Sequence, residues 1–204
     1  MAETRVPPGL HLPGVEANPK PGAYASLVEA ARARGAEYPK IWDLFAYQHG
    51  VTRHMGAFTQ GVLRESSSIS PAWRELIAAY TSHLNQCGFC TQAHAHTAAQ
   101  MLGDEALVWS VLRDVENASL SNAEKALLRF VRKVTLDLSA VTDEDAATLR
   151  AAGWDDDAIY FTVTTCALFN FYNRWITAAG VPQMSDEAHR AQGQALATRG
   201  YTRD

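Results

Sequence analysis

The spacing of apolar and polar residues is helical along most of the chain. From Ala23 onward, alanine, leucine, glutamate and arginine recur at helical intervals, and alternating runs of β-branched residues are almost absent. This pattern predicts an all-α protein. The expected helices span residues 23–34, 39–49, 52–65, 71–84, 88–102, 104–113, 121–137, 142–152, 155–178 and 185–198.

Local start and stop signals support several of these helices. Ser70 followed by Pro71 is typical of an N-cap with proline at the first helical position. Ser121 stands three residues before Glu124, which is the spacing of a capping box. Gly153 follows a segment that begins with acidic residues, so we expect that helix to end there.

The beginning of the chain is rich in proline. Five of the eight prolines lie between Pro7 and Pro21, which argues against regular helix or a central strand there. We therefore expect an extended arm over residues 1–22, a single all-helical domain over 23–183, and a C-terminal helix and tail over 184–204. The arm is also expected to wrap around a neighbouring subunit.

Composition narrows the classes of partner. The 204 residues are 47% hydrophobic and 20% charged, which is an ordinary globular balance. The formal net charge is −4 and no basic stripe is present, so we expect no nucleic-acid partner. The most apolar stretch, residues 158–169, is too short to span a bilayer, and the N-terminus has no signal-peptide core. A cytoplasmic protein without membrane contact is expected.

The segment "LNQCGFCTQAHAHTA" holds two of the three cysteines and two of the seven histidines. On one helix, Cys87, Cys90 and His94 project at about 0°, 300° and 340°, so they share one face. The free N–H groups of the first helical turn favour a thiolate there. Three cysteines in a chain without a leader argue against a structural disulfide framework and for a metal or redox role of the close pair.

A carboxylate is expected beside this histidine. Glu75 lies twelve residues before Cys87, and Asn85 and Gln86 are better suited to a turn than to a helix interior. A reversal near Asn85 would place Glu75 level with His94. Glu75 would then orient His94 and strengthen it as a base, and His94 would take the proton from Cys90, one helical turn away.

Three interpretations of the cysteine pair remain at this point. A redox dithiol is favoured over a zinc site, which lacks a clear fourth ligand, and over inert packing. Cys166 lies in an apolar run and is expected to be a buried small hydrophobe. Asn170, Asn173 and Arg174 are expected to have structural roles, with Arg174 pairing an acidic residue across a subunit contact.

These residues match a known family. The segment "WRELIAAYTSHLNQCGFCTQAHAHTA" resembles the alkylhydroperoxidase AhpD-like proteins of the carboxymuconolactone decarboxylase family, with Glu75, Cys87, Cys90 and His94 at the four motif positions. The later "FVRKVT", "VTDEDAATLRAAG" and "FNFYNRWITAAGVP" resemble its peroxidase-related branch. The resemblance covers roughly residues 38–182 and leaves out the arm and the last twenty residues.

The resemblance implies an AhpD-like helical bundle that forms dimers, trimers or hexamers, and a thiol peroxidase without cofactor or metal. It implies that Cys90 attacks the peroxide and that Cys87 then closes a disulfide, although position at the helix start alone favours Cys87 as the more acidic thiol. An external thiol or protein dithiol would reduce the disulfide. Some members have a histidine between the cysteines where this chain has Gly88 and Phe89, which removes a proton donor and makes the pocket more apolar.

The expected activity is therefore reduction of hydrogen peroxide or an organic hydroperoxide through a Cys87–Cys90 dithiol and disulfide cycle. Two alternatives stay open: a general disulfide oxidoreductase with weak peroxidase activity, and a non-catalytic zinc-binding helical protein. Decarboxylase chemistry is disfavoured, because it belongs to members that lack the cysteine pair.

Overall fold

The computed structural model describes residues 9–202, and these residues form helices without any strand. The elements, in chain order, are α1 (Pro13–Ala17), α2 (Ala23–Ala33), α3 (Ile41–Tyr47), α4 (His49–Arg64), α5 (Pro71–Leu84), α6 (Gly88–Leu102), α7 (Glu105–Arg113), α8 (Asn122–Leu136), the 3-10 turn η1 (Leu138–Ala140), α9 (Asp143–Ala151), α10 (Asp156–Ala179) and α11 (Asp186–Arg199). The all-α prediction is confirmed.

The ten predicted helices are all present, and their caps are those expected. The Ser70 side chain accepts a hydrogen bond from the Trp73 amide at the start of α5. Ser121 and Glu124 form the reciprocal capping box of α8. Helix α9 ends at Ala151, and Gly153 follows two residues later with a left-handed φ of 101°.

The proline-rich N-terminal segment contains a short helix that the sequence did not predict. Pro13 starts α1, because proline at the first helical position needs no amide hydrogen and already has a helical φ. The expectation that this segment contains no helix is therefore wrong for Pro13–Ala17, while the part of the arm before Gly9 lies outside the described residues.

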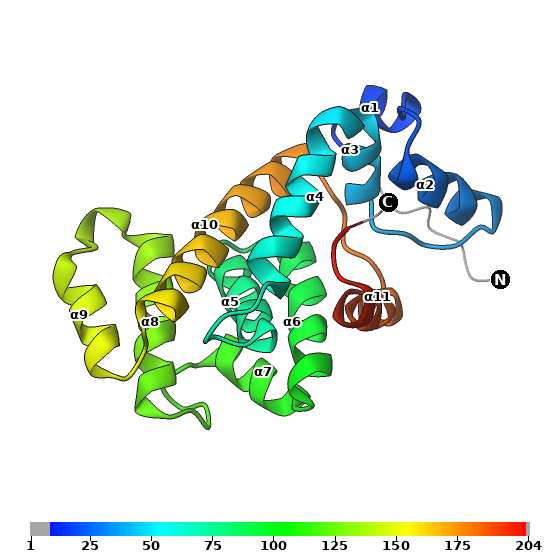
Figure 1. Cartoon of the computed structure of the whole chain (residues 1–204). Coiled ribbons are helices and arrows are strands. Elements are labelled where there is room, and N and C mark those ends of the chain that lie inside the picture. The colour runs from blue at the N-terminus through cyan, green and yellow to red at the C-terminus, as the bar shows by residue number, and fades with distance from the viewer. Residues whose placement is uncertain (1–8, 203–204) are drawn as a thin grey trace.

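Helices α5 and α6 form an antiparallel hairpin at the centre of the molecule, with α10 packed along α5 and α11 packed along α6 (Figure 1). The turn between them is tight: Asn85 caps α5, Gln86 has φ of 57°, and the Cys87 amide donates to the Ser82 carbonyl at 3.0 Å. The predicted reversal near Asn85 is thus confirmed. It places the start of α6 beside the end of α5.

Two main apolar clusters stabilise this arrangement. The first lies between α5, α7, α8 and α10 and includes Leu76, Ile77 and Leu127, which are fully buried. The second lies between α3, α4, α6 and α10 and includes both Cys87 and Cys90. The cysteine pair is therefore part of a packed, water-poor region where polar interactions are strengthened.

Helix α11 approaches α6 closely at Gly193. A Cβ atom there would lie 2.6 Å from the Cβ of His96 and 2.9 Å from its carbonyl carbon, so only glycine fits without movement. After α11 the chain runs back toward α4 (Figure 1). There Tyr201 hydrogen-bonds to Gln60 of α4 and to Glu75 of α5. The C-terminal segment is thus part of the fold around the cysteine pair.

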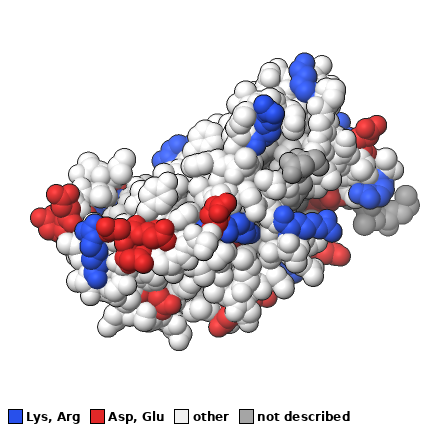
Figure 2. Space-filling model, in the orientation of Figure 1, with Lys and Arg blue, Asp and Glu red and all other residues white. Residues whose placement is uncertain are grey.

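The surface carries mixed charge. In Figure 2, acidic side chains gather at the end of the molecule where α8 and α9 lie, and most of the blue Lys and Arg side chains lie separately over the middle and the opposite end of this face. No continuous basic stripe crosses the face shown. Within the described part of the chain, no helix is both long and apolar enough to cross a membrane.

Candidate active site

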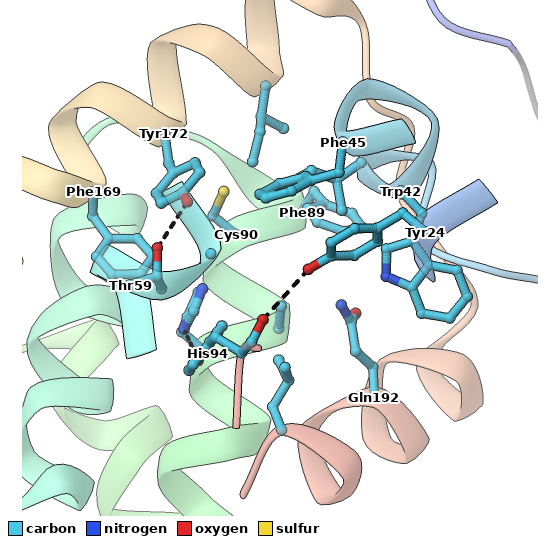
Figure 3. Close-up of a pocket in the computed structure, with 16 residues that line it drawn as sticks. Tyr24, Trp42, Phe45, Thr59, Phe89, Cys90, His94, Phe169, Tyr172 and Gln192 are labelled. Carbon is cyan, nitrogen blue, oxygen red and sulfur yellow. Dashed lines mark hydrogen bonds between the residues drawn. The ribbon is translucent and has the colours of Figure 1, made fainter. Parts of the chain in front are cut away.

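A cavity of about 80 Å³ lies between α2, α3, α4, α6, α10 and α11 (Figure 3). This volume holds several water molecules or part of a small organic molecule. Its walls are mainly aromatic and apolar, with a few polar groups. The lining residues include Tyr24, Trp42, Phe45, Thr59, Phe89, Cys90, His94, Phe169, Tyr172, Gln192 and Tyr201.

The two cysteines occupy different positions relative to this cavity. Cys90 lies in the first turn of α6 and lines the cavity wall, together with His94 one turn later (Figure 3). Cys87 is the N-cap residue of α6, is buried, and is not among the lining residues. Both are free thiols. A small molecule in the cavity therefore meets the Cys90 sulfur first.

The thiols of Cys87 and Cys90 are hydrogen-bonded to each other, which moves their proton affinities in opposite directions. Donation from the Cys90 thiol and its backbone amide, with further hydrogen bonds from Thr177 and Asn173, lowers the pKa of Cys87 to about 6 against the opposing effect of burial. The same hydrogen bond, together with burial and the charge of Cys87, holds the pKa of Cys90 well above its ordinary value. The pair thus carries one proton and one negative charge near neutral pH.

Glu75 and His94 are in direct contact. Helix α5 presents Glu75 toward α6, and Glu75 Oε2 lies 2.7 Å from His94 Nδ1. A carboxylate only accepts hydrogen bonds, so the imidazole carries its hydrogen on Nδ1 and its Nε2 is left as an acceptor. The His94 ring is held edge-on against Phe169, with ring centroids 4.3 Å apart.

The other Glu75 oxygen has two partners. Arg64 Nη2 lies 2.6 Å from Glu75 Oε1, and the Tyr201 hydroxyl donates to the same oxygen at 2.6 Å. Burial alone would raise the pKa of Glu75, but the hydrogen bond and charge of His94, the charge of Arg64 and the Tyr201 hydrogen bond lower it overall. Glu75 is therefore an ionised, fully buried carboxylate with every oxygen satisfied.

The structure places the predicted site residues as two pairs, Glu75 with His94 and Cys87 with Cys90, and one member of each pair, His94 and Cys90, lines the same cavity. It also adds residues that the sequence reasoning missed. Glu75 pairs with Arg64 and not with its sequence neighbour Arg74, which donates instead to backbone carbonyls of Val62 and Glu65.

Asn173 is the second addition. Its side chain donates to Ser82 Oγ at 2.9 Å and hydrogen-bonds to the cysteine pair from α10. We expected only a structural role, but a polar group in the middle of the apolar helix α10 was the signal for this contact. Arg174 donates to the carbonyl and side-chain oxygens of Asn170 at 2.7 and 2.8 Å.

The other cysteine and histidine side chains near α6 lie outside the cluster. Cys166 is buried against Thr135 and does not line the cavity, and burial raises its pKa. His96 packs edge-on against Trp109. Across residues 9–202, no group of three or more histidine, cysteine, aspartate or glutamate side chains is arranged to hold a metal ion.

Fold and site together define a helical protein with two buried thiols, a histidine and a carboxylate beside a small cavity. The model of the carboxymuconolactone decarboxylase family matches residues 50–133, the segment that carries all four motif residues. No curated protein matches the chain. The resemblance to this family and to its AhpD-like, peroxidase-related proteins is confirmed.

Several solved structures share the fold. An uncharacterized peroxidase-related protein from Silicibacter sp. TM1040 is 26% identical, with a TM-score of 0.75, over 93% of this chain and 97% of its own. A second, described as an alkylhydroperoxidase AhpD core and peroxidase-related protein from Ralstonia eutropha JMP134, is 22% identical, with a TM-score of 0.71, over 84% and 95%. The debrominase Bmp8 in complex with 2,3,4-tribromopyrrole is 17% identical, with a TM-score of 0.68, over 88% and 96%.

The first of these similarities extends beyond residues 38–182, the part to which we had limited the resemblance. A match over 93% of the chain must include most of the segments before and after that range. The shared fold therefore continues beyond the range of the sequence resemblance, whereas the family model matches only residues 50–133 within it.

Proposed function

We propose that this protein is a thiol-dependent peroxidase that reduces hydroperoxides through a Cys87–Cys90 dithiol and disulfide cycle. The observation that carries this proposal is that Cys90 lines the cavity while Cys87 is hydrogen-bonded to it from behind and the Glu75–His94 pair lies beside it. An attacking sulfur, a second sulfur and a base are thus all within one site.

In the first step, Cys90 passes its proton to the Cys87 thiolate, and the Cys90 thiolate attacks the terminal oxygen of the hydroperoxide. The O–O bond breaks, Cys90 becomes a sulfenic acid, and the alkoxide takes the proton from the Cys87 thiol, which returns Cys87 to the thiolate. Asn173, which hydrogen-bonds to both sulfurs, stabilises the negative charge whichever sulfur holds it.

In the second step, Cys87 attacks the sulfur of the Cys90 sulfenic acid. The S–O bond breaks, hydroxide leaves and becomes water, and a disulfide joins the two sulfurs. The peroxide has then gained two electrons and the protein has lost two. An external thiol or protein dithiol supplies the two electrons that return the disulfide to the dithiol.

The cavity lining favours an organic hydroperoxide over hydrogen peroxide. Seven phenylalanine, tyrosine and tryptophan side chains line the cavity with Cys90, and they would contact an apolar or aromatic group on the peroxide. Gly88 and Phe89 replace the histidine that some relatives have between the cysteines, which makes the wall beside Cys90 more apolar.

The proposed homo-oligomer, the cytoplasmic location and the division at residues 22 and 183 remain predictions.

The fold shared with a debrominase provides a second candidate. The same dithiol would convert an aryl bromide and two thiols into the debrominated arene, a disulfide and hydrogen bromide, which balances two electrons. The aromatic cavity wall suits such a substrate as well. A general disulfide oxidoreductase is the third candidate function. This activity requires that the disulfide of a substrate reaches Cys90 in the cavity.

Turnover measured with cumene hydroperoxide, hydrogen peroxide, an aryl bromide and a model disulfide discriminates between these candidates. We expect fastest turnover with cumene hydroperoxide. Cys90→Ser should abolish it with the fold intact, and Cys87→Ser should accumulate a sulfenic acid that dimedone traps. Cys166→Ser is the matched control and should keep full activity. Full peroxidase activity in Cys90→Ser would contradict the mechanism.

A further inference from the structure

The chain after α11 is fixed against the site by contacts from two other helices. The Tyr201 amide donates to Gln60 Oε1 of α4 at 2.7 Å, and the Tyr24 hydroxyl of α2 donates to the Tyr201 carbonyl at 3.4 Å. The preceding Gly200 has φ of 68°, a left-handed conformation that favours glycine. A Cβ atom on Gly200 would also overlap the Gln60 side chain.

These contacts hold the Tyr201 side chain over the Glu75–His94 pair. Its hydroxyl donates to Glu75 Oε1 at 2.6 Å and lies 3.3 Å from His94 Nδ1. Its ring is nearly parallel to the His94 ring, with centroids 6.1 Å apart and planes 14° apart, and the Arg64 guanidinium lies 5.0 Å from the ring centroid. Tyr201 therefore contacts both Glu75 and His94.

We infer that Tyr201, delivered by the C-terminal tail, is a positioning residue that sets how strongly Glu75 draws the Nδ1 proton of His94, and through His94 the acidity of the dithiol. This inference rests on the proposed roles of Glu75, His94 and the cysteine pair. A hydrogen bond donated to Glu75 Oε1 withdraws negative charge from the carboxylate, so less remains for the His94 contact at Oε2.

The charged and titratable groups that face Glu75 come from four elements. Arg64 of α4, His94 of α6 and Tyr201 of the tail contact the carboxylate, and Arg74 lies next to it on α5. Burial and the charge of Glu75 raise the pKa of Tyr201 well above its ordinary value, so the phenol keeps its proton and acts only as a donor. The dithiol itself is faced by His94, by Tyr172 and by the neutral Asn173.

The sign of the effect follows from this arrangement. Removing the Tyr201 hydroxyl leaves more negative charge on Glu75, so the Nε2 atom of His94 becomes a stronger acceptor and draws the dithiol proton more strongly. The dithiol should then ionise at lower pH. Replacing Glu75 by glutamine removes the negative charge altogether, so the dithiol should ionise at higher pH. A purely structural loss would shift the midpoint pH of both variants in the same direction.

The test is the pH profile of alkylation of the reduced protein by iodoacetamide, which needs no peroxide. Relative to the wild-type midpoint, we expect Tyr201→Phe to shift the midpoint downward by about half a pH unit, which is about threefold in rate at a fixed pH below it. Glu75→Gln should shift it upward. Tyr160→Phe, at an exposed tyrosine of α10, should leave it unchanged.

A variant that ends at Gly200 guards against a folding failure of Tyr201→Phe, because it retains all the helices and removes the ring. If the truncation only widens access to the cavity, the plateau rate of alkylation should rise and the midpoint pH should stay the same. A lower midpoint, as in Tyr201→Phe, requires a change in the ionisation of the dithiol, and this is the result that we expect. An unchanged or raised midpoint in either folded variant overturns the inference. Absence of peroxide turnover in the wild type would instead contradict the proposed function and leave this comparison intact.

Discussion

Glu75 on α5 and His94 on α6 are nineteen residues apart in the chain, and Glu75 Oε2 lies 2.7 Å from His94 Nδ1. The turn at Asn85 and Gln86 allows this contact, because it reverses the chain within three residues and brings α6 back alongside α5. The contact fixes the imidazole with its Nδ1 hydrogen toward the carboxylate, so the other nitrogen remains an acceptor.

Replacing Glu75 by glutamine should cost both activity and stability. The new amide would place a donor against the Nδ1 hydrogen of His94 or against Arg64, so one hydrogen bond is lost in a buried site. Arg64 would also lose its countercharge. We expect peroxidase activity to fall by about 100-fold and the free energy of unfolding by about 2 kcal/mol.

The matched control is Glu65→Gln, an exposed glutamate at the end of α4. Urea denaturation and steady-state kinetics on both variants provide the comparison. Equal losses in the two variants would show that the Glu75 contacts carry no special role.

The wild-type dithiol should react with alkylating agents well below the pH at which an ordinary cysteine does. Because the pKa of Cys87 is about 6, we expect the alkylation rate to be half-maximal near pH 6 and to level off above it. The rate should fall as the pH drops below this value and the pair takes up its second proton. A midpoint near the ordinary thiol value would contradict the hydrogen-bonded pair.

Asn173 contributes to that low midpoint, and Asn173→Ala should raise it. Its side chain hydrogen-bonds to both sulfurs and stabilises their charge, so its removal leaves the thiolate with fewer donors. Asn170→Ala is the control, because Asn170 lies one turn earlier on α10 and contacts Cys166. The same alkylation profile measures both, and a shift shared by the two variants would argue against a specific contact.

His189 should make the protein sensitive to acid. It is 1% exposed, and burial, with the charge of His96, lowers its pKa to about 4. The unfolded chain takes up a proton at His189 below about pH 6.5, whereas the folded protein resists it until about pH 4. Stability should therefore fall as the pH drops through this window, by about 3 kcal/mol.

Urea denaturation at several pH values between 7.5 and 4 tests this expectation. In His189→Asn, the part of the pH dependence that belongs to His189 should disappear. His54→Asn, at an exposed histidine of α4, is the control. An identical pH dependence in wild type and His189→Asn would contradict it.

The helices and the motif cluster could be predicted from the sequence because the signals are local. Pro71, Ser121 and Gly153 mark helix ends through interactions within a few residues. The position of His94 relative to Cys90 follows from helical geometry alone. Only the contact with Glu75 needed a longer step, and the turn-forming residues Asn85 and Gln86 supplied it.

The remaining site residues could not be predicted, because tertiary packing brings them in. Arg64 ends α4 and Tyr201 follows α11, and neither has a spacing that connects it to Glu75. The close approach of α11 to α6 at Gly193 delivers Tyr201, and a single glycine in a helix is not a recognisable signal. Likewise, Pro13 lies in a proline-rich segment that favoured an extended chain, although proline is compatible with the first turn of a helix.

The central claim is that Cys87 and Cys90 join reversibly when a hydroperoxide reaches Cys90. Intact-protein mass spectrometry after one equivalent of cumene hydroperoxide, with free thiols counted per chain, tests it most directly. We expect two of the three thiols to disappear, the mass to decrease by about two hydrogens with no oxygen added, and dithiothreitol to restore both thiols. Three free thiols after the peroxide, or an adduct confined to Cys166, would contradict it.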